Sequence, residues 1–140
     1  MRDIPKISAA EWEIMKVIWK ENPLTSQKII NSLSDKMGWS AQTIKTFLAR
    51  LVKKEIIGFK KSGRIYNYYP LISEDECIKV ENKSFLHKVY DGAVSILFTK
   101  FLEEESLSEK EIEHLEKLLK SKKEKRSNFK SFWIIMKEEC

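Results

Sequence analysis

Residues Ser40–Lys54 read SAQTIKTFLARLVKK, which is the pattern of an amphipathic helix. The apolar residues recur at intervals of three and four, so they fall on one helical stripe. They are Ile44, Phe47, Leu48, Leu51 and Val52. Ser40 is a suitable N-cap, and Trp39 precedes it where a hydrophobic staple with Ile44 is expected. The stretch therefore predicts a helix that begins at Ser40 and buries one face.

The opposite face of this helix is polar and cationic. Hydroxyl and amide groups can approach base edges, while lysine and arginine can meet guanine or phosphate. The helix residues that we expect to contact DNA are Ser40, Gln42, Thr43, Lys45, Thr46 and Arg50. An ordinary solvent-exposed face has a similar composition, so the neighbouring segments must decide between the two interpretations.

A β-hairpin is predicted directly after this helix. Residues 56–70 contain two runs rich in Ile, Phe and Tyr, on either side of a Ser62-Gly63 turn. The cations around the expected tip are Lys60, Lys61 and Arg64. A helix for the major groove followed by a basic hairpin for the flanking backbone is the winged helix-turn-helix order. The alternative is a surface hairpin whose lysines only increase solubility. The position of the hairpin directly after the candidate recognition helix favours DNA binding over this alternative.

Two helices are expected upstream. The first runs from Ser8 to about Asn22 and begins with a capping box between Ser8 and Glu11. Its expected apolar face consists of Trp12, Met15, Ile18 and Trp19. The second runs from about Thr25 to Lys36, and Gly38 is placed to end it in the left-handed conformation.

Charge is distributed unevenly along the 140 residues. Residues 1–70 contain 13 Lys and Arg against 6 Asp and Glu, whereas residues 71–123 contain 9 against 12. A basic half joined to a mildly acidic half indicates that the first part faces a polyanion and the second does not.

The residues after the hairpin predict a helical dimerisation module. One helix is expected from Ser73 to about Tyr90, a break at Asp91-Gly92, and a last helix from Ser108. Between them, residues 93–102 are apolar on almost every side, and such a helix must be surrounded by partners that a small domain lacks. The residues expected at the interface with a second copy are Phe85, Val89, Val94, Leu97, Phe98, Phe101, Leu102, Leu115 and Leu119.

The fold predicted from these segments is mainly α-helical with a small β-hairpin wing. Residues 1–71 are expected to form a winged helix-turn-helix DNA-binding domain, residues 72–123 a helical dimerisation domain, and residues 124–140 a basic and aromatic extension. The extension has two interpretations. Its aromatic residues are expected either to pack on the dimerisation module or to contact a membrane surface together with the preceding basic run.

No feature of the sequence indicates an enzyme or a cofactor. His87 and His114 form no ligand-spaced cluster, and Cys77 and Cys140 lack the paired spacing of a zinc site or a disulfide framework. We therefore expect no catalytic residue, no metal and no other cofactor. The first residues, MRDIPKISAAEWE, show no apolar run of signal-peptide length, and no apolar run reaches the roughly 20 residues that cross a bilayer. A cytoplasmic protein without stable membrane insertion is therefore expected.

Several strings of the sequence resemble the BlaI/MecI/CopY family of penicillinase repressors. They are AEWEIM at residues 10–15, Ile18-Trp19, Trp39-Ser40, TIKT at residues 43–46, Arg50-Leu51, Tyr68-Tyr69, Phe85-Leu86, Val89-Tyr90 and Gly92. The resemblance covers about residues 5–123. It implies a homodimeric winged-helix repressor that binds inverted-repeat operators of resistance genes, with the residues listed above for the helix falling on the operator-contacting helix.

The resemblance also implies a mode of inactivation. In the β-lactam branch of the family, a membrane sensor metalloprotease triggers cleavage of an Asn-Phe bond in the dimerisation domain. The matching bond here is Lys100-Phe101, where lysine replaces asparagine and the apolar residue after the bond is kept. The copper-responsive branch carries paired Cys-x-Cys motifs, which this sequence lacks, so copper sensing is not expected.

Two other function classes compete with a cleaved repressor. A winged-helix regulator that a small ligand releases from DNA would have a similar architecture, but it would stay intact on induction. A module that only binds other proteins would show no salt-sensitive DNA binding.

Overall fold

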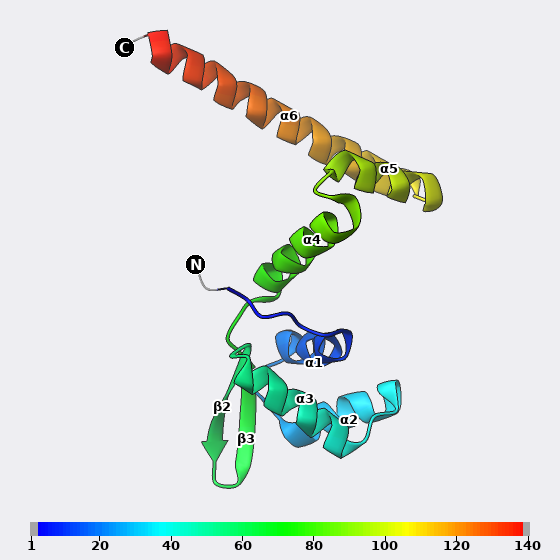
Figure 1. Cartoon of the computed structure of the whole chain (residues 1–140), viewed down its shortest axis with the longest axis vertical. Helices are drawn as coiled ribbons and strands as arrows, with labels where there is room; N and C mark the ends of the chain where they lie inside the picture. The colour runs from blue at the N-terminus through cyan, green and yellow to red at the C-terminus, as the bar shows by residue number, and fades with distance from the viewer. Residues whose placement is uncertain (1–2, 139–140) are drawn as a thin grey trace. The chain divides into compact units, whose positions relative to one another are not determined.

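The computed structural model describes the backbone of residues 3–138 and the side chains of residues 3–126. The chain forms two compact units, Met1–Gly92 and Ala93–Cys140. Figure 1 traces them from blue to red along the sequence. The first unit ends after its last helix, some twenty residues beyond the domain boundary expected after residue 71. The functional division into DNA-binding and dimerisation domains remains a prediction.

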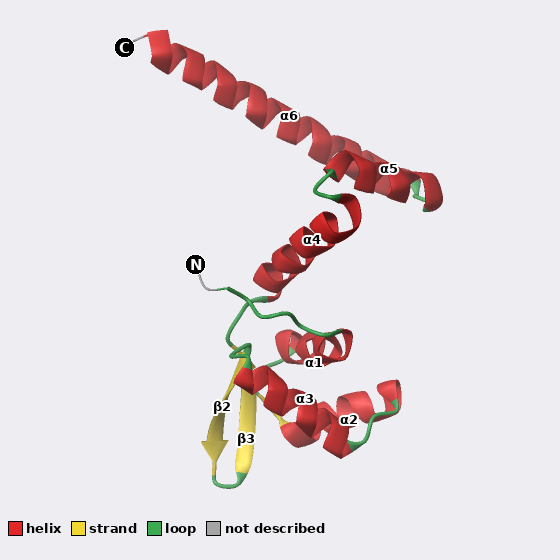
Figure 2. Ribbon diagram, in the orientation of Figure 1, coloured by secondary structure: helices red, strands yellow, loops and turns green. Residues whose placement is uncertain are grey.

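The first unit contains four helices and three strands in its described residues. In chain order they are α1 (Ala9–Lys20), β1 (Leu24–Thr25), α2 (Ser26–Met37), α3 (Ala41–Lys53), β2 (Ile57–Ser62), β3 (Ile65–Pro70) and α4 (Glu74–Tyr90). Three helices followed by a hairpin is the predicted winged helix-turn-helix order, and Figure 2 shows the hairpin projecting beside α3. The mainly helical fold with a small β wing is confirmed.

Hydroxyl caps set the beginnings of these helices, serine for α1, α3 and α4 and Thr25 for α2. The Ser8 hydroxyl accepts the backbone N–H of Glu11 while the Glu11 carboxylate accepts that of Ser8, which completes the predicted capping box. The Ser40 hydroxyl accepts the N–H of Thr43, so α3 begins where the sequence predicts. Gly38 ends α2 at φ 69°, the left-handed conformation that a residue without a Cβ adopts readily.

The sheet has three antiparallel strands in the order β1-β3-β2. Strands β2 and β3 form the predicted hairpin, with Phe59 opposite Tyr68 and Lys61 opposite Tyr66. The short strand β1 was not predicted. Its two residues, Leu24 and Thr25, lack the length of a strand pattern, and only pairing with Tyr68 and Asn67 of β3 makes them a strand.

The core of the first unit lies between the helices and the base of the sheet. Its large fully buried apolar residues come from α1, α2, α3 and the entry to β2: Ile14, Met15, Ile18, Ile29, Leu33, Ile44, Leu48, Leu51, Ile56 and Ile57. Burial of such a side chain contributes about 1.5 to 3 kcal/mol. Cys77 of α4 and Glu11 of α1 are also fully buried. Trp12 and Trp19 were expected inside, but they are only half-buried and pack on the core from its edge. Ile14 takes an inner position instead.

The second unit consists of α5 (Val94–Glu104) and α6 (Glu109–Glu138). No residue of α5 is buried, although its sequence is the most apolar of the described helices. The last helix is longer than expected, because α6 continues without a break through the residues assigned to a separate extension. Asp91 and Gly92 have positive φ angles of 50° and 86°, and they form the predicted break before this unit.

Candidate nucleic-acid interface

Helix α3 presents a polar face to solvent because its apolar stripe is held in the core. Ile44, Leu48 and Leu51 are buried, which fixes the rotation of the helix about its axis. The side chains of Gln42, Lys45, Thr46 and Arg50 are consequently exposed, and Thr43 is half-exposed. The structure thus places all the sequence-predicted residues of α3 at or near the solvent face.

The hydroxyl groups on this face also take part in local hydrogen bonds. The Ser40 and Thr43 hydroxyls lie 3.0 Å apart, and the Thr46 hydroxyl donates to the carbonyl oxygen of Gln42 at 3.0 Å. These bonds orient the three hydroxyl groups along the helix. A hydroxyl that donates locally keeps oxygen lone pairs that can accept from a base amino group.

Arg50 lies over an aromatic side chain in the last turn of α3. Its guanidinium carbon is 5.8 Å from the centre of the Phe47 ring, and the Phe47 ring lies 5.2 Å from the ring of Trp39. Stacking on an aromatic face restricts the rotamers of arginine and leaves the edge of its planar fork available. That fork can donate two parallel hydrogen bonds to guanine or to a phosphate.

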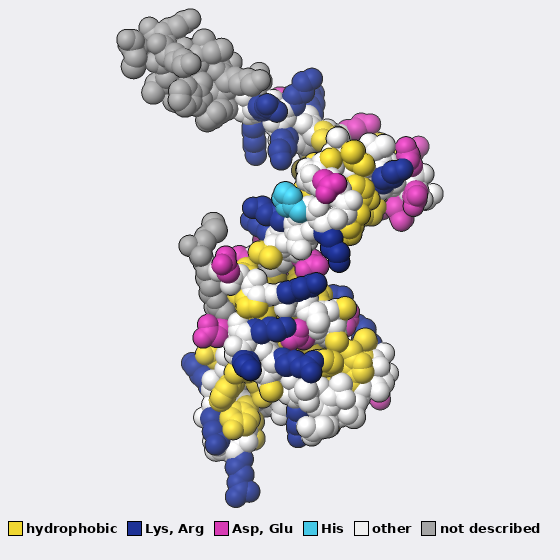
Figure 3. All heavy atoms as spheres, in the orientation of Figure 1, with side chains coloured by type: hydrophobic (Ala, Val, Ile, Leu, Met, Phe, Trp, Pro, Cys, Tyr) yellow, Lys and Arg dark blue, Asp and Glu magenta, His cyan; other side chains and the backbone are white. Residues whose placement is uncertain are grey.

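The hairpin carries cations on both faces. Successive strand residues point to opposite sides, so Lys60 and Lys61 lie on different faces of β2. The Lys61 ammonium lies 5.6 Å from the centre of the Tyr66 ring, its cross-strand neighbour. Arg64 is at the tip, which is dark blue at the lower end of Figure 3.

Three aromatic residues of the hairpin form a cluster that the sequence reading did not include in the site. Phe59, Tyr66 and Tyr68 share one face, and the rings of Phe59 and Tyr66 are 4.8 Å apart. The side chains of Phe59 and Tyr66 are exposed to solvent although both are large aromatic residues. Side chains alternate between the two faces along each strand, and the register pairs Phe59 with Tyr68. The sequence alone lacked this register, so it did not indicate the shared face.

A partly buried ion pair joins the end of α3 to α1. The ammonium of Lys54 donates to Oε1 of Glu11 at 2.7 Å and to the carbonyl oxygen of Lys6 at 2.9 Å. Burial raises the pKa of Glu11, but the hydrogen bonds from Lys54 and Ser8 outweigh this effect and hold the pKa below its ordinary value. Among the described residues of this unit, Glu11 is the one buried charged side chain, and the sequence suggested only its capping role.

The residues predicted for dimerisation are distributed over both units. Phe85 and Val89 belong to α4, whereas the remainder belong to α5 and α6. Seven of the nine are exposed in the single chain: Phe85, Val89, Val94, Phe98, Phe101, Leu102 and Leu119. Leu97 and Leu115 are half-buried. The second unit therefore has an apolar surface without a covering element among the described residues.

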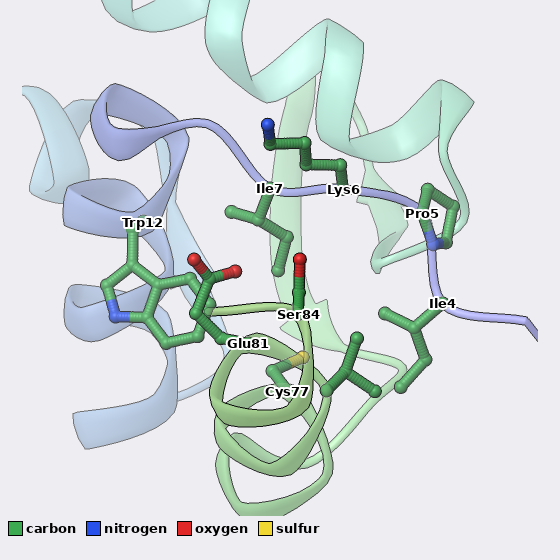
Figure 4. A pocket seen from close by; sticks show the side chains of 9 residues that line it. Ile4, Pro5, Lys6, Ile7, Trp12, Cys77, Glu81 and Ser84 are labelled. Carbon is green, nitrogen blue, oxygen red and sulfur yellow. The ribbon is translucent and has the colours of Figure 1, made fainter. Parts of the chain in front are cut away.

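The first unit also contains a small pocket, shown in Figure 4. Its volume is about 190 Å³, and it lies between the N-terminal segment at Ile4–Ile7, the start of α1 and one side of α4. Trp12, Cys77, Val80, Glu81 and Ser84 complete its lining. Burial, and then the neighbouring Glu76, raise the pKa of the Cys77 thiol, so Cys77 is an unreactive core residue.

The described residues contain no group of three or more His, Cys, Asp or Glu side chains that could hold a metal ion. No helix in the described part of the chain is long and apolar enough to cross a membrane.

Comparisons with known proteins agree with the arrangement of helix and hairpin. The family model described as "Penicillinase repressor" matches residues 7–121. The penicillinase repressor of Bacillus licheniformis is 40% identical over 126 residues, which cover 90% of this chain and 98% of that protein. The methicillin resistance regulatory protein MecI of Staphylococcus aureus strain N315 is 39% identical over 117 residues, 84% of this chain and 95% of that protein.

A solved structure matches about half of the chain. It is the solution structure of the DNA-binding domain of the repressor BlaI, with 45% sequence identity and a TM-score of 0.50. The match covers 54% of this chain and 93% of the solved domain.

Proposed function

Because the chain belongs to the penicillinase repressor family of transcriptional repressors, we propose that it acts as a homodimer that binds inverted-repeat operator DNA of β-lactam-resistance-type genes. Members of this family are repressors and not enzymes. The observation that carries the proposal is the solvent face of α3, where Gln42, Lys45 and Arg50 stand exposed on a helix anchored by its opposite face.

In this proposal α3 enters the major groove and the hairpin lies on the flanking backbone. Base edges are met by the amide and hydroxyl groups near the start of α3, where Ser40, Gln42, Thr43 and Thr46 lie within two helical turns. The cations Lys45, Arg50, Lys60, Lys61 and Arg64 supply contacts to phosphate or guanine. Such contacts release counterions, so binding weakens steeply as salt rises.

The test is selection of binding sites from a random pool of duplex DNA by the purified full chain. The enriched sequences should contain two inverted half-sites whose centres lie one helical turn, or a small multiple of it, apart, because a two-fold dimer requires a two-fold operator. A pool without any enriched sequence would contradict the proposal.

We place the dimer contacts on the apolar residues of α4, α5 and α6. A helix without a single buried residue, such as α5, exposes apolar area that water disfavours, and a second copy of the same surface would remove that area from water. The half-burial of Leu97 and Leu115 assigns them to contacts within the unit as well. The more exposed Phe98, Phe101 and Leu119 are therefore the cleaner probes of a dimer.

We further propose that proteolysis at Lys100-Phe101 inactivates the repressor, with a membrane sensor metalloprotease as the inactivating partner. The bond lies inside α5, so cleavage would interrupt that helix and separate most of it from α6. A protease requires an extended chain, so local opening of α5 must precede the cut. Loss of dimerisation lowers operator affinity by a factor on the order of 10² to 10⁴, because two tethered domains no longer bind together.

Inactivation is tested by treating cells with a β-lactam and following the repressor by blot and mass spectrometry. A fragment that ends at Lys100 is the expected product. Derepression while the chain stays at full length would exclude cleavage.

The second candidate function is release from DNA by a small ligand. It is favoured by the pocket of about 190 Å³, whose lining includes Lys6. The carbonyl oxygen of Lys6 accepts from Lys54 at the end of α3, so a ligand that moved this segment would act on the DNA-contacting helix. Derepression of an intact chain, combined with ligand binding that the pocket-filling variant Ser84→Trp abolishes, would support this function over cleavage.

A further inference from the structure

The C-terminal half of α6 has no role in the function proposed above. The penicillinase repressor family model ends at residue 121, yet α6 continues to Glu138 as one helix. The proposed DNA contacts and dimer contacts all lie before this point. The additional helix therefore calls for a partner of its own.

The first part of this extension is strongly cationic. Residues 120–126 contain five cations and one carboxylate, and all their side chains are exposed. The cations are Lys120, Lys122, Lys123, Lys125 and Arg126. Figure 3 shows them as a dark blue group on α6 next to the grey region. Such a cluster on one helix attracts an anionic surface.

The second part of the extension is aromatic and apolar in sequence. Four of its positions rise in number by steps of three, one and three, so on the continuous helical backbone of α6 these positions share one face. They are Phe129, Phe132, Trp133 and Met136. This statement concerns their positions on the helix, because their side chains lie outside the described ones. Tryptophan and phenylalanine beside lysines is the composition of helices that lie in a membrane interface.

We propose that the C-terminal half of α6 binds peripherally to an anionic lipid surface. The cations of residues 120–126 meet lipid phosphates, while the positions from Phe129 to Met136 supply the apolar face that enters the headgroup boundary. The longest apolar run of the segment is Phe132–Met136, five residues, far below the roughly 20 that span a bilayer. The helix therefore lies on the surface and does not cross it.

A second copy of α6 fits this segment less well. The apolar positions Leu115 and Leu119 continue at the same spacing to Lys122 and Arg126 before Phe129. Pairing two parallel helices along that seam would bring each of these cations close to its counterpart, and like charges repel. An anionic lipid surface neutralises them instead.

DNA also fits less well than lipid. The phosphate backbone of DNA would pair with the cations, but it offers no apolar surface for the four apolar and aromatic positions on the next turns. A lipid interface accommodates both parts of the segment on one helix.

The direct test is co-sedimentation of the full chain with vesicles. Vesicles of phosphatidylcholine with about one third phosphatidylglycerol should sediment the protein, whereas pure phosphatidylcholine vesicles should not, because about 1 kcal/mol per basic residue comes from the anionic surface. Equal sedimentation with both kinds of vesicle, or none with either, would overturn the proposal.

Two matched variants test the charge contribution. The double variant Lys122→Gln with Lys125→Gln should weaken partitioning onto the anionic vesicles roughly 30-fold, because it removes the attraction of two lysines to the anionic surface. The control, Lys110→Gln with Lys117→Gln, removes the same charge from exposed positions earlier on α6 and should change partitioning by much less. Equal losses in the two pairs would mean that net charge alone acts, which contradicts a site at residues 120–126.

Tryptophan fluorescence tests the apolar contribution. The emission of the full chain should shift to shorter wavelength on anionic vesicles, and Trp133→Phe should lose that shift while still sedimenting. A shift that persists in this variant would place the buried tryptophan elsewhere and overturn the assignment to α6.

The same variants separate this inference from the proposed function. Lys122→Gln with Lys125→Gln should leave operator affinity unchanged if the segment serves lipid. A loss of operator affinity with unchanged vesicle partitioning would instead assign residues 120–126 to DNA, and failure of operator binding by the unmodified chain would count against the repressor proposal alone.

Discussion

The ammonium of Lys54 donates to the carboxylate of Glu11 at 2.7 Å, and this bond ties the end of α3 to the first turn of α1. The carboxylate is almost fully buried, with 2% of its side chain exposed, and the lysine side chain is 31% exposed. A charge so buried stabilises the fold only while its partner is present. The pair therefore holds α3, the helix proposed to contact DNA, at a fixed position on the core.

Glu11→Gln should lower the free energy of unfolding by about 2 kcal/mol, the typical contribution of a hydrogen bond to a charged group. Urea denaturation followed by circular dichroism measures this change. Glu13→Gln is the matched control, because Glu13 pairs with Lys16 on the surface and such pairs contribute about 0 to 1 kcal/mol. Equal losses in both variants would show that the Glu11–Lys54 bond stabilises the fold no more than a surface pair does.

The stability of the protein should decrease in acid through Glu11. Its pKa is held below the ordinary value of 4.5 in the folded chain, so its contribution is present above pH 4.5 and is lost as the pH falls through the lowered folded pKa. The free energy of unfolding of the unmodified chain should therefore fall over this window more than that of Glu11→Gln. Parallel curves for the two proteins below pH 4.5 would refute the assignment.

Arg50→Ala and Lys45→Ala should separate base contacts from phosphate contacts. If the residue contacts a base, its replacement should weaken the free energy of operator binding by roughly 1 to 3 kcal/mol and relax the base preference at one position of the operator. A residue that contacts phosphate should weaken all sequences alike and reduce the salt slope by about one. Fluorescence anisotropy at several salt concentrations measures both effects, with the exposed α1 residue Lys20→Ala as the control. Wild-type binding by both variants would remove this face of α3 from the interface.

Lys60→Ala and Lys61→Ala should affect operator binding unequally. The two lysines lie on opposite faces of β2, and only one face of the hairpin can meet the flanking backbone. The salt slope should fall by about one for the lysine on the DNA side and stay unchanged for the other. The same slope change in both variants would mean that the hairpin inserts edge-on.

Phe98→Asp should dissociate the proposed dimer without unfolding the chain. Phe98 is 53% exposed in the single chain, so aspartate there costs little until a second copy buries it. Burial of an unpaired carboxylate then costs several kcal/mol. Analytical ultracentrifugation measures the dimer, and Thr99→Asp, an exposed position about 100° around the same helix from Phe98, is the control. A dimer of unchanged strength in Phe98→Asp would place the interface elsewhere.

The sequence by itself determined the local features of the fold. Ser8, Ser40 and Ser73 begin α1, α3 and α4 because a hydroxyl three residues before a free backbone N–H acts without help from the rest of the chain. The periodicity of α3 likewise predicted its buried stripe and, from that, its solvent face. The family resemblance was confirmed by the comparisons, whereas the individual DNA-contacting and dimer residues remain predictions.

Only the tertiary structure decided the features that depend on distant residues. The Glu11–Lys54 bond joins positions 43 residues apart, and the indole N–H of Trp19 donates to the carbonyl oxygen of Ile72, 53 residues away. Leu24 and Thr25 became a strand only by pairing with β3, and α4 joined the first compact unit and not the second. Hydrogen bonding and burial between distant segments depend on how the whole chain packs, and no local spacing of residue types contains that information.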